Sequence, residues 1–378
     1  MRILFWNQWF LPSLGGAEVF TARLAGRLIA RGHEALVVAT RYPYHLPEDE
    51  VINGVPVRRI AFLDALTPGG KDQRAALRLV RDITVGVADL KRVFRPDVVH
   101  VNLSDASPLF HLRTLDAHRC PTVVTLQSAL LQSSVGTDNL TASILRQAAR
   151  VVAVSGAAAR NIAKFADKTL AEIDIVAPGI PADEFAPSQA DVSPGQIPTI
   201  AFIGRLVSEK GADVAIEAVA QLSGAACLQC IGDGVERDRL QGLVRERRLG
   251  SFVRFAGQVD DTERRRLLSE SFVVVVPSLH EELFGMVAVE GALSGLPVIA
   301  SAIGGLQEIV EHGRTGFLFP AGNAGALARH LRTLIADPAA SRRMGTAGRA
   351  KALLHYTIEH TADSYEHIYA SAIRRQRE

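Results

Sequence analysis

Two glutamates, Glu282 and Glu290, stand eight residues apart in a segment that is otherwise apolar, HEELFGMVAVEGALSGLPVIAS at 280–301. The preceding run, FVVVVPS, is typical of a strand buried on both faces. A helix is expected to begin near Phe284–Gly285 and to end around Ser294–Gly295, so Glu282 lies just ahead of its N-terminus. Free N–H groups and the helix dipole favour an anion at that place.

Each glutamate has a structural explanation as well as a functional one. Glu282 is either the anion that caps the helix or a carboxylate that binds a ligand. Glu290 has apolar neighbours all round the helix, and an ionised carboxylate in such surroundings needs a partner. That partner is either an internal arginine or the hydroxyl groups of a ligand, and the sequence leaves both alternatives open.

The spacing of the two glutamates favours an extended ligand. Eight residues of helix rise roughly 12 Å, whereas the two carboxylates of a glycosidase stand about 5–10 Å apart across one sugar linkage. A ligand with hydroxyl groups at both ends and an anionic middle, such as a nucleotide-sugar, suits the larger separation.

Cations for a diphosphate follow another strand, in GRLVSEKG at 204–211. Arg205 and Lys210 are expected to leave the carboxyl edge of the sheet together. A guanidinium and an ammonium beside a helix N-terminus form a pyrophosphate clamp without a metal. The structural alternative is a pair of solvated loop cations.

Strand-like and helical segments alternate along the whole chain, which predicts an α/β protein with parallel sheets covered on both faces. In the first half, strands are expected at 2–6, 34–40, 55–60, 97–101, 122–126, 150–154 and 174–177. In the second half, strands are expected at 199–204, 227–232, 253–257, 272–278 and 297–301. Expected helices include 17–32, 212–222, 260–271 and a last amphipathic helix from Thr357 onward.

The stretch 181–198, rich in Pro, Ser and Ala, is the best linker candidate. The order of elements predicts two Rossmann-like domains, 1–190 and 191–378, that face each other across a cleft. The C-terminal helix is expected to cross back to the first domain. Ligands of open parallel sheets bind beyond the carboxyl ends of the strands, so the cleft is the expected site.

Composition excludes several classes of function. The formal charge is +2 and neither half carries a strong excess of basic residues, so nucleic-acid binding has no electrostatic support. No apolar run reaches the roughly 20 residues of a membrane span, and the N-terminus opens as a strand rather than a signal peptide. We therefore expect a cytoplasmic protein. Three cysteines are too few for a disulfide scaffold.

Other signals have competing interpretations. Asp260 followed three residues later by Glu263 is typical of a capping box rather than a metal site, and no metal or other cofactor is expected. His100 ends a strand and is expected to pack or hydrogen-bond at the cleft rather than catalyse, and with Gln127 it is a candidate for binding the acceptor or orienting the sugar. Trp9 and Phe10, in the loop after the first strand, either stack on acceptor sugars or pack under the loop.

Residues 71–95 mix apolar and basic positions at helical spacing. Basic amphipathic helices can lie on anionic membranes, which would place the protein on the inner membrane face. An ordinary surface helix with a charged outer face is the more common case.

Several of these stretches resemble one known family. IGRLVSEKG, IGDGVERDRL, FAGQV and PSLHEELFGMVAVEGALSGLPVIAS, followed by GGLQEIVEHGRTGFLF, resemble the retaining glycosyltransferases of family four, which have the GT-B fold. GGAE at 15–18, GHE at 32–34 and VVHV at 98–101 agree with it. The resemblance covers nearly the whole chain, and the Glu-x7-Glu element is its most specific motif.

The resemblance implies transfer of a sugar from a nucleotide-diphosphate-sugar to a hydroxyl acceptor, with retention of anomeric configuration and without a metal. The acceptor, which would be a glycan, a lipid-linked sugar or a small molecule, would bind the first domain, and the donor would bind the second. Glu282 would bind hydroxyls of the transferred sugar, Glu290 the ribose, and Arg205 with Lys210 the diphosphate. Other implied donor contacts are the backbone amides of Phe284, Gly285, Met286 and Val287, together with Gly232, Val259 and Gly16.

The sequence departs from the family at two places. The family often has His-Asp after its TVVT-like strand, with the His near the reacting sugar, whereas TVVTLQS places Gln127 and Ser128 there. Gln127 can donate a hydrogen bond but cannot carry a charge. The common Pro-Asn-Gly-Val-Asp is replaced by Ala-Pro-Gly-Ile-Pro at 177–181.

Two other functions remain open at this point. A nucleotide-sugar epimerase of the same architecture would isomerise the donor alone. A nucleotide-sugar-binding protein with weak or lost catalysis is motivated by Gln127. A dinucleotide dehydrogenase is disfavoured, because no G-x-G-x-x-G follows the first strand of either domain.

Overall fold

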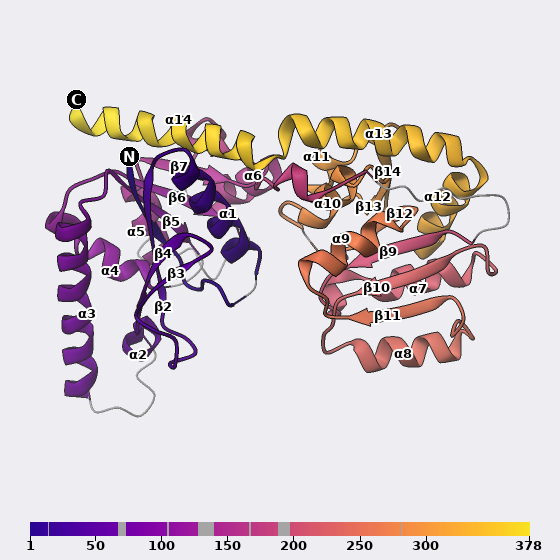
Figure 1. The fold of residues 1–378 in the computed structure, drawn as a ribbon, viewed down its shortest axis with the longest axis horizontal. Coiled ribbons are helices and arrows are strands. Elements are labelled where there is room, and N and C mark those ends of the chain that lie inside the picture. The colour runs from indigo at the N-terminus through magenta and orange to yellow at the C-terminus, as the bar shows by residue number, and fades with distance from the viewer. Residues whose placement is uncertain are drawn as a thin grey trace. The chain divides into compact units, whose positions relative to one another are not determined.

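The computed structural model of the chain divides into two compact units (Figure 1). Unit 1 comprises Met1–Gly179 and Ile358–Glu378, and unit 2 comprises Ile180–Thr357. The structure describes residues 1–13, 15–66, 73–103, 106–127, 140–165, 168–187, 197–280 and 282–378.

Unit 1 is built on an eight-stranded sheet in which every neighbouring pair is parallel except the edge pair β3–β4. In spatial order the strands are β3 (Asp49–Ile52), β4 (Val55–Ile60), β2 (Glu34–Thr40), β1 (Arg2–Trp6), β5 (Val98–Leu103), β6 (Thr122–Leu126), β7 (Arg150–Ala153) and β8 (Ile173–Ile175). The helices are α1 (Gly16–Ala30), α2 (Phe62–Leu66), α3 (Gln73–Phe94), α4 (Pro108–Leu112), α5 (Leu140–Gln147), α6 (Gly156–Phe165) and α14 (Ile358–Arg377).

Alternating side chains of the central strand β1 pack on opposite faces of this sheet. Ile3 and Phe5 belong to the core cluster that α1 and α14 complete. Trp6 faces the other way and packs on Phe62 of α2, with 5.2 Å between ring centroids. The period of two in β1 therefore places one helix layer on each face.

Unit 2 has an all-parallel six-stranded sheet. In spatial order its strands are β11 (Val253–Gly257), β10 (Cys227–Ile231), β9 (Thr199–Ile203), β12 (Val273–Val276), β13 (Val298–Ser301) and β14 (Gly316–Phe319). The helices are α7 (Ala212–Ala220), α8 (Arg237–Glu246), α9 (Asp261–Ser269), α10 (Met286–Leu293), α11 (Leu306–Ile309), α12 (Ala324–Ala336) and α13 (Pro338–His355). Because all strands run the same way, their carboxyl ends share one edge.

The α/β class, the two parallel-sheet units and the placement of the C-terminal helix with the first unit agree with expectation. The division falls at Gly179–Ile180 rather than at residue 190. The reason is that the first part of the supposed linker packs on unit 2. The side chain of Phe185 is buried there, its carbonyl accepts a hydrogen bond from Arg349 (2.8 Å), and Glu184 pairs with Arg265 at 3.0 Å. Residues 188–196 lie outside the described part of the chain.

Candidate functional site

The loops that follow β9 and β12 are held together at the carboxyl edge of the unit 2 sheet. Gly211, after the short 3-10 turn Ser208–Lys210, has a positive φ of 66°. A Cβ at this position would lie 2.1 Å from the carbonyl oxygen of Pro277, so only glycine permits the contact. The N–H of Leu279 also donates to the carbonyl of Glu209 at 2.8 Å. These contacts bring the Lys210 loop against the loop that carries Glu282.

Lys210 and Glu282 form an ion pair, with 2.5 Å between Nζ and Oε2. The hydroxyl of Ser278, which is buried, donates to the same carboxylate oxygen at 3.2 Å. Both protein partners therefore use Oε2. Oε1 accepts no hydrogen bond from the residues that the structure describes. Sequence reasoning placed Lys210 and Glu282 on different parts of the donor and did not foresee that they would contact each other.

Arg205 lies at the same edge and is exposed. It forms no ion pair with a described residue, but it lies close enough to Glu209 to act on that group. The pKa of Glu209 is lowered first by a hydrogen bond from its own backbone N–H, and further by Ser208, His280 and Arg205. Arg205 is thus exposed at the carboxyl edge of the sheet, near the loop that carries Lys210.

A glycine pair after β13 supports the Glu282 segment, and sequence reasoning missed it. The N–H of Gly305 donates to the carbonyl of Glu282 at 2.7 Å. Gly304 has a φ of 47°, and a Cβ there would lie 2.1 Å from the same carbonyl oxygen. The signal that could have found this support is the Gly-Gly pair that follows the buried strand 297–301.

Replacing Gly304 with Ala should therefore displace the Glu282 segment. A shift on the order of 1 Å at a substrate-positioning group can cost about 10²-fold in rate, and we expect a loss of that size in kcat/KM for the donor. Gly313→Ala is the matched control, because Gly313 also has a positive φ (80°) but has open space where the Cβ would stand. Circular dichroism gives the melting temperature of each variant, and activity is measured below it. Equal activity of the two variants would count against this support.

The helix that follows Glu282 begins one residue later than Gly285, at Met286, with Gly285 as its N-cap. The side chain of Phe284 is buried and meets Tyr356 edge to face, with ring centroids 5.7 Å apart. The N–H groups of Met286 and Val287 donate to no described acceptor, as expected in a first helical turn. This end of α10 thus offers N–H groups close to the Lys210–Glu282 pair.

Glu290 lies within α10 and is only 5% exposed. Its Oε1 is 3.3 Å from a guanidinium nitrogen of Arg264 on α9, and the same nitrogen pairs with Asp261 at 3.0 Å. The internal arginine that the sequence left open is therefore present. Arg264 thus divides one guanidinium nitrogen between Glu290 and Asp261.

The remaining donor-binding candidates lie at strand ends. Gly232 follows β10 and its N–H donates to the carbonyl of Gly257 at 2.8 Å. Val259, after β11, is half-buried. Asp260 caps α9 by accepting from the N–H of Glu263 at 2.8 Å, which confirms the N-cap. Among the described residues no group of three His, Cys, Asp or Glu side chains is placed to hold a metal ion.

In unit 1, Gly16 is the first residue of α1 and is exposed, with open space beside it. Glu18 in the same turn lies close to Gly15, since a Cβ there would meet its carboxylate at 2.3 Å. Burial raises the pKa of Glu18, and a hydrogen bond from its own backbone N–H opposes this in part. An acidic group thus stands beside the N–H groups expected to receive phosphate.

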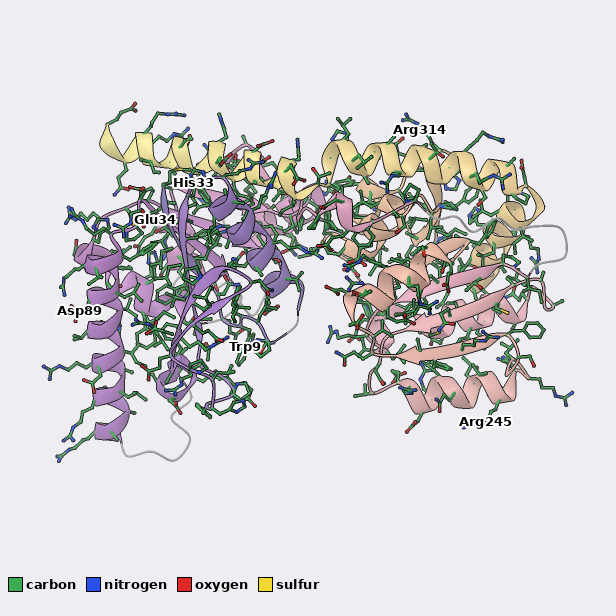
Figure 2. All side chains as sticks on the ribbon, viewed as in Figure 1. Trp9, His33, Glu34, Asp89, Arg245 and Arg314 are labelled. Carbon is green, nitrogen blue, oxygen red and sulfur yellow. The ribbon has the colours of Figure 1, made fainter. Side chains whose placement is uncertain are left out.

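The two aromatic residues after β1, Trp9 and Phe10, differ in burial. Phe10 is 1% exposed and belongs to the unit 1 core, which corrects its assignment as an acceptor-binding candidate. Trp9, which is labelled in Figure 2, is half-buried and meets Tyr42 edge to face at 5.5 Å, and Tyr42 meets the exposed Tyr44 in the same way. Trp9 therefore remains an acceptor-site candidate.

His100 is a core residue, which corrects its placement among the sugar-orienting candidates. It is fully buried in the middle of β5, under α14. Its Nδ1 is 2.6 Å from the hydroxyl of Tyr369, its Nε2 is 2.8 Å from Thr125 Oγ1, and Tyr365 completes the network. Desolvation lowers the pKa of His100 to about 3.

This buried histidine predicts a pH dependence of stability. The unfolded chain takes up a proton near pH 6.5 and the folded chain only near pH 3, so stability is present above pH 6.5 and falls as the pH is lowered toward 3. Between pH 7.5 and pH 5, His100 should cost unit 1 about 2 kcal/mol. Urea unfolding followed by tryptophan fluorescence tests this, because both tryptophans, Trp6 and Trp9, lie in unit 1.

His100→Gln should lose that share of the pH dependence, while His45→Gln, which changes an exposed histidine, should retain it. An unchanged slope in His100→Gln would contradict the assignment.

Gln127 immediately follows β6 at the carboxyl edge of the unit 1 sheet. Its Nε2 donates to Asn102 Oδ1 at 3.1 Å, and Asn102 bonds in turn to Asn7 and Thr21. Sequence reasoning found Gln127 but missed the three buried residues behind it. Ser128 lies outside the described residues.

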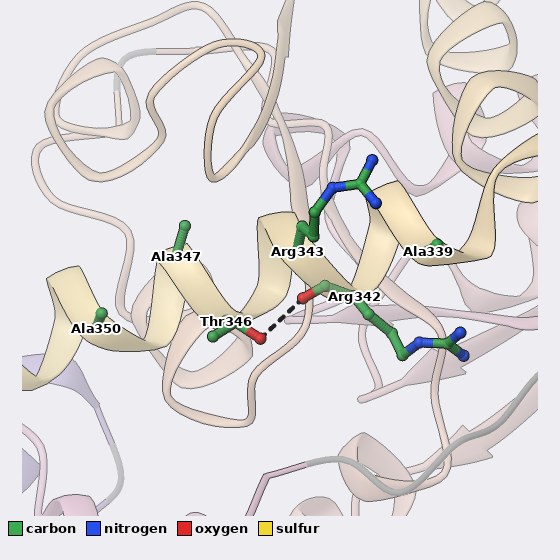
Figure 3. Close-up of a pocket in the computed structure, with 6 residues that line it drawn as sticks. All are labelled: Ala339, Arg342, Arg343, Thr346, Ala347 and Ala350. Atoms are coloured by element: carbon green, nitrogen blue, oxygen red, sulfur yellow. Dashed lines mark hydrogen bonds between the residues drawn. The ribbon is translucent and has the colours of Figure 1, made fainter.

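A hollow of about 520 Å³ lies along α13 (Figure 3). Its lining comes from one helix only and consists of Ala339, Arg342, Arg343, Thr346, Ala347 and Ala350. It contains none of the residues discussed above, and we assign it no role in the site.

Comparison with known proteins matches the two halves of the chain to two glycosyltransferase family models. Residues 14–184 match the family model described as Glycosyltransferase Family 4, and residues 187–351 match Glycosyl transferases group 1. A glycogen synthase of Mycobacterium tuberculosis is 30% identical over 412 aligned residues, which cover 100% of this chain and 96% of that protein. A GDP-mannose-dependent alpha-mannosyltransferase of the same organism is 31% identical, covering 85% and 84%.

Among solved structures, HepE of Anabaena in complex with UDP and glucose has a TM-score of 0.78 at 24% identity, covering 98% of this chain and 100% of that one. The chain belongs to the family-four glycosyltransferases of the GT-B fold. Its activity is the transfer of a sugar from a nucleotide-sugar donor.

Proposed function

We propose that the protein transfers the sugar with retention of anomeric configuration and without a metal ion, from a donor bound at the carboxyl edge of unit 2. The observation that carries this proposal is the Lys210–Glu282 ion pair beside N–H groups in the first turn of α10 that donate to no described acceptor. It places a cation, a hydroxyl-binding carboxylate and a helix N-terminus together, which are the groups that a sugar diphosphate requires.

Lys210 can serve Glu282 and the diphosphate at once. Its ammonium carries three N–H donors, and one of them is used on Glu282 Oε2 at 2.5 Å. The other two are directed to diphosphate oxygens in the proposal, together with Arg205 and the amides of residues 284–287. Oε1 of Glu282 then accepts hydrogen bonds from hydroxyls of the transferred sugar.

The rest of the donor is assigned along the same edge. Glu290 accepts from the ribose hydroxyls on the side not turned to Arg264. Gly232 and Val259, at the ends of β10 and β11, lie along the nucleoside. The backbone N–H of Gly16, at the N-terminus of α1, binds phosphate oxygens in the proposal. The phosphate then takes the place of the Glu18 carboxylate beside this turn.

Retention follows if the departing phosphate deprotonates the acceptor hydroxyl on the face from which it leaves. This route asks for no enzyme nucleophile. The protein's part is electrostatic, since Arg205, Lys210 and the α10 amides stabilise the charge that builds on the leaving diphosphate. The two side-chain cations supply the positive charge for which a metal would otherwise be required.

A thermal-shift screen against UDP-, GDP-, ADP- and dTDP-sugars tests the donor site, followed by transfer assays with the donor that binds. Stabilisation by none of them would overturn the proposal. Proton NMR of the anomeric centre in the product decides between retention and inversion. Incubating the donor without acceptor distinguishes an epimerase from a transferase, because an epimerase would form a new sugar epimer. A binding protein without catalysis would release no nucleotide when an acceptor is added.

Membrane contact is a separate part of the proposal and rests on the outer face of α3. This face combines exposed arginines with exposed apolar side chains, and Asp89 on it points outward (Figure 2). The exposed arginines and larger apolar residues are Arg74, Leu77, Arg78, Arg81, Val85, Arg92 and Val93, and Asp82 and Asp89 are exposed on the same helix. Such a face suits an anionic lipid surface. In the described part of the chain no helix is long and apolar enough to cross a membrane.

Flotation with vesicles containing phosphatidylglycerol separates membrane contact from an ordinary surface helix. Binding that is lost when Arg74, Arg78 and Arg81 are changed to Glu supports the contact. The matched control changes Arg245, Arg248 and Arg254 of unit 2 to Glu. Failure of the unchanged protein to float removes this part of the proposal.

A further inference from the structure

Gln127 belongs to a chain of four hydrogen-bonded polar side chains at the carboxyl edge of the unit 1 sheet. Asn7 follows β1, Thr21 lies on α1, Asn102 lies near the end of β5, and Gln127 follows β6. The first three are nearly inaccessible, with exposures of 2%, 0% and 3%, while Gln127 is half-buried. In an open parallel sheet this edge is where ligands bind.

The protons of Thr21 and Asn102 can be assigned one by one. The hydroxyl of Thr21 has one proton, and the Ala17 carbonyl at 2.9 Å is a nearer acceptor than Asn7 Oδ1 at 3.3 Å. Thr21 Oγ1 is therefore left to accept from Asn7 Nδ2 at 2.9 Å and from Asn102 Nδ2 at 3.0 Å. The second proton of Asn102 Nδ2 goes to Asn7 Oδ1 at 2.9 Å.

Exchanging Oδ1 and Nδ2 in both Asn7 and Asn102 would leave too few protons for the acceptors. It would surround Thr21 with three acceptor oxygens, from Ala17, Asn7 and Asn102, and Thr21 has a single proton to give. Because buried polar groups are costly when unpaired, the network fixes the amide orientation that diffraction alone seldom distinguishes. Asn102 must then present Oδ1 to Gln127.

The orientation of Gln127 follows from that of Asn102. An acceptor oxygen at 3.1 Å requires Nε2 of Gln127 to face it, because two carbonyl oxygens would repel. Oε1 of Gln127 is therefore turned away from Asn102, and within the described residues nothing donates to it. The network thus holds a neutral acceptor oxygen at the sheet edge in a fixed orientation.

We infer that Oε1 of Gln127 accepts a hydrogen bond from a hydroxyl of the bound substrate, and that Asn102 is the positioning residue that fixes this polarity. The inference rests on the proposed function, because it assumes a carbohydrate substrate. The hydroxyl belongs either to the transferred sugar or to the acceptor. In both cases Gln127 serves as a hydrogen-bond acceptor that carries no charge.

The test uses UDP-glucose, or the donor that the thermal-shift screen selects, with its 2-, 3-, 4- and 6-deoxy and deoxyfluoro analogues. Fluorine can accept a hydrogen bond but cannot donate one. If a donor hydroxyl donates to Gln127, both analogues at one position should lose on the order of tenfold in kcat/KM. Gln127→Ala should remove that discrimination at the same position and leave it unchanged at the others.

Two further arms locate the hydroxyl and test Asn102. If the hydroxyl is on the transferred sugar, hydrolysis of the donor without acceptor should show the same discrimination against deoxy donors. If only KM for deoxy acceptors changes, the hydroxyl belongs to the acceptor. Asn102→Ala frees Gln127 to turn over and should weaken the discrimination although Gln127 is unchanged. Tryptophan fluorescence monitors the folding of unit 1 in each variant, and Gln147→Ala, an exposed glutamine of α5, is the control.

The inference is overturned if the deoxyfluoro analogue reacts as well as the parent sugar at the position that Gln127→Ala affects, because Gln127 would then be donating. It is also overturned if Gln127→Ala leaves every discrimination, on donor and acceptor, as in the unchanged protein. Absence of turnover with every donor and acceptor removes the proposed function itself, and the inference with it. These outcomes are distinguishable, since the last one is seen before any variant is made.

Discussion

Replacing Lys210 with alanine is expected to lower kcat by on the order of 10²–10³-fold. The ammonium lies 2.5 Å from Glu282 and beside the α10 N-terminus, where the charge of the leaving diphosphate builds in the proposed donor site. Because that charge is larger in the transition state than in the bound donor, kcat should fall more than KM rises. Among the described residues, Ser278 is then the remaining side-chain partner of the Glu282 carboxylate, which loosens the oxygen proposed to bind the sugar.

Steady-state kinetics with the selected donor measure this effect. Lys210→Arg retains the charge and should keep more activity than Lys210→Ala. Lys164→Ala removes an exposed lysine of unit 1 and serves as the control. A kcat close to normal in Lys210→Ala would refute the diphosphate clamp.

Glu290→Ala is the second change with a large expected effect. Hydrogen bonds to a charged group contribute about 1.5–3 kcal/mol each, so loss of the ribose contacts should reduce kcat/KM for the donor by on the order of 10²-fold. The specific readout is the ribose itself. The unchanged protein should prefer a ribonucleotide donor to its 2′-deoxyribose analogue, and Glu290→Ala should not.

This readout separates the two roles of Glu290. If the carboxylate served only Arg264, at 3.3 Å, the variant would lose stability but keep the preference for ribose. Glu270→Ala, which removes an exposed carboxylate after α9 that pairs with Arg266, is the matched control. An unchanged ribose preference in Glu290→Ala would assign the residue to the structure of unit 2 alone.

Local sequence patterns were sufficient to locate most of the fold. Buried parallel strands such as Val273–Val276 are continuous apolar runs, and the helix after that strand begins within two residues of its expected start, with Gly285 as N-cap. Two strands were missed. β3 (Asp49–Ile52) is a polar edge strand with exposed positions, and β14 (Gly316–Phe319) is only four residues long after a turn-rich segment. Neither has enough periodicity to stand out.

The candidate site was predictable only where one segment carries the chemistry. Glu282, Glu290, Arg205 and Lys210 were found from residue type and spacing. The contact between Lys210 and Glu282 joins residues 72 apart in the chain, and it depends on how two loops pack, which no local pattern records. The burial of His100 depends on Tyr369, 269 residues later. Long-range packing therefore decided both the main addition to the site and one of the corrections.

Unit 2 is a single uninterrupted segment, whereas unit 1 is assembled from both ends of the chain. The chain leaves unit 1 at Gly179 and returns at Ile358, and the two crossings are paired, since Ile180 donates to the carbonyl of Tyr356 at 3.0 Å. Tyr365 and Tyr369 fill the unit 1 core. During synthesis, the whole of unit 2 is therefore made before α14, which supplies part of the unit 1 interior.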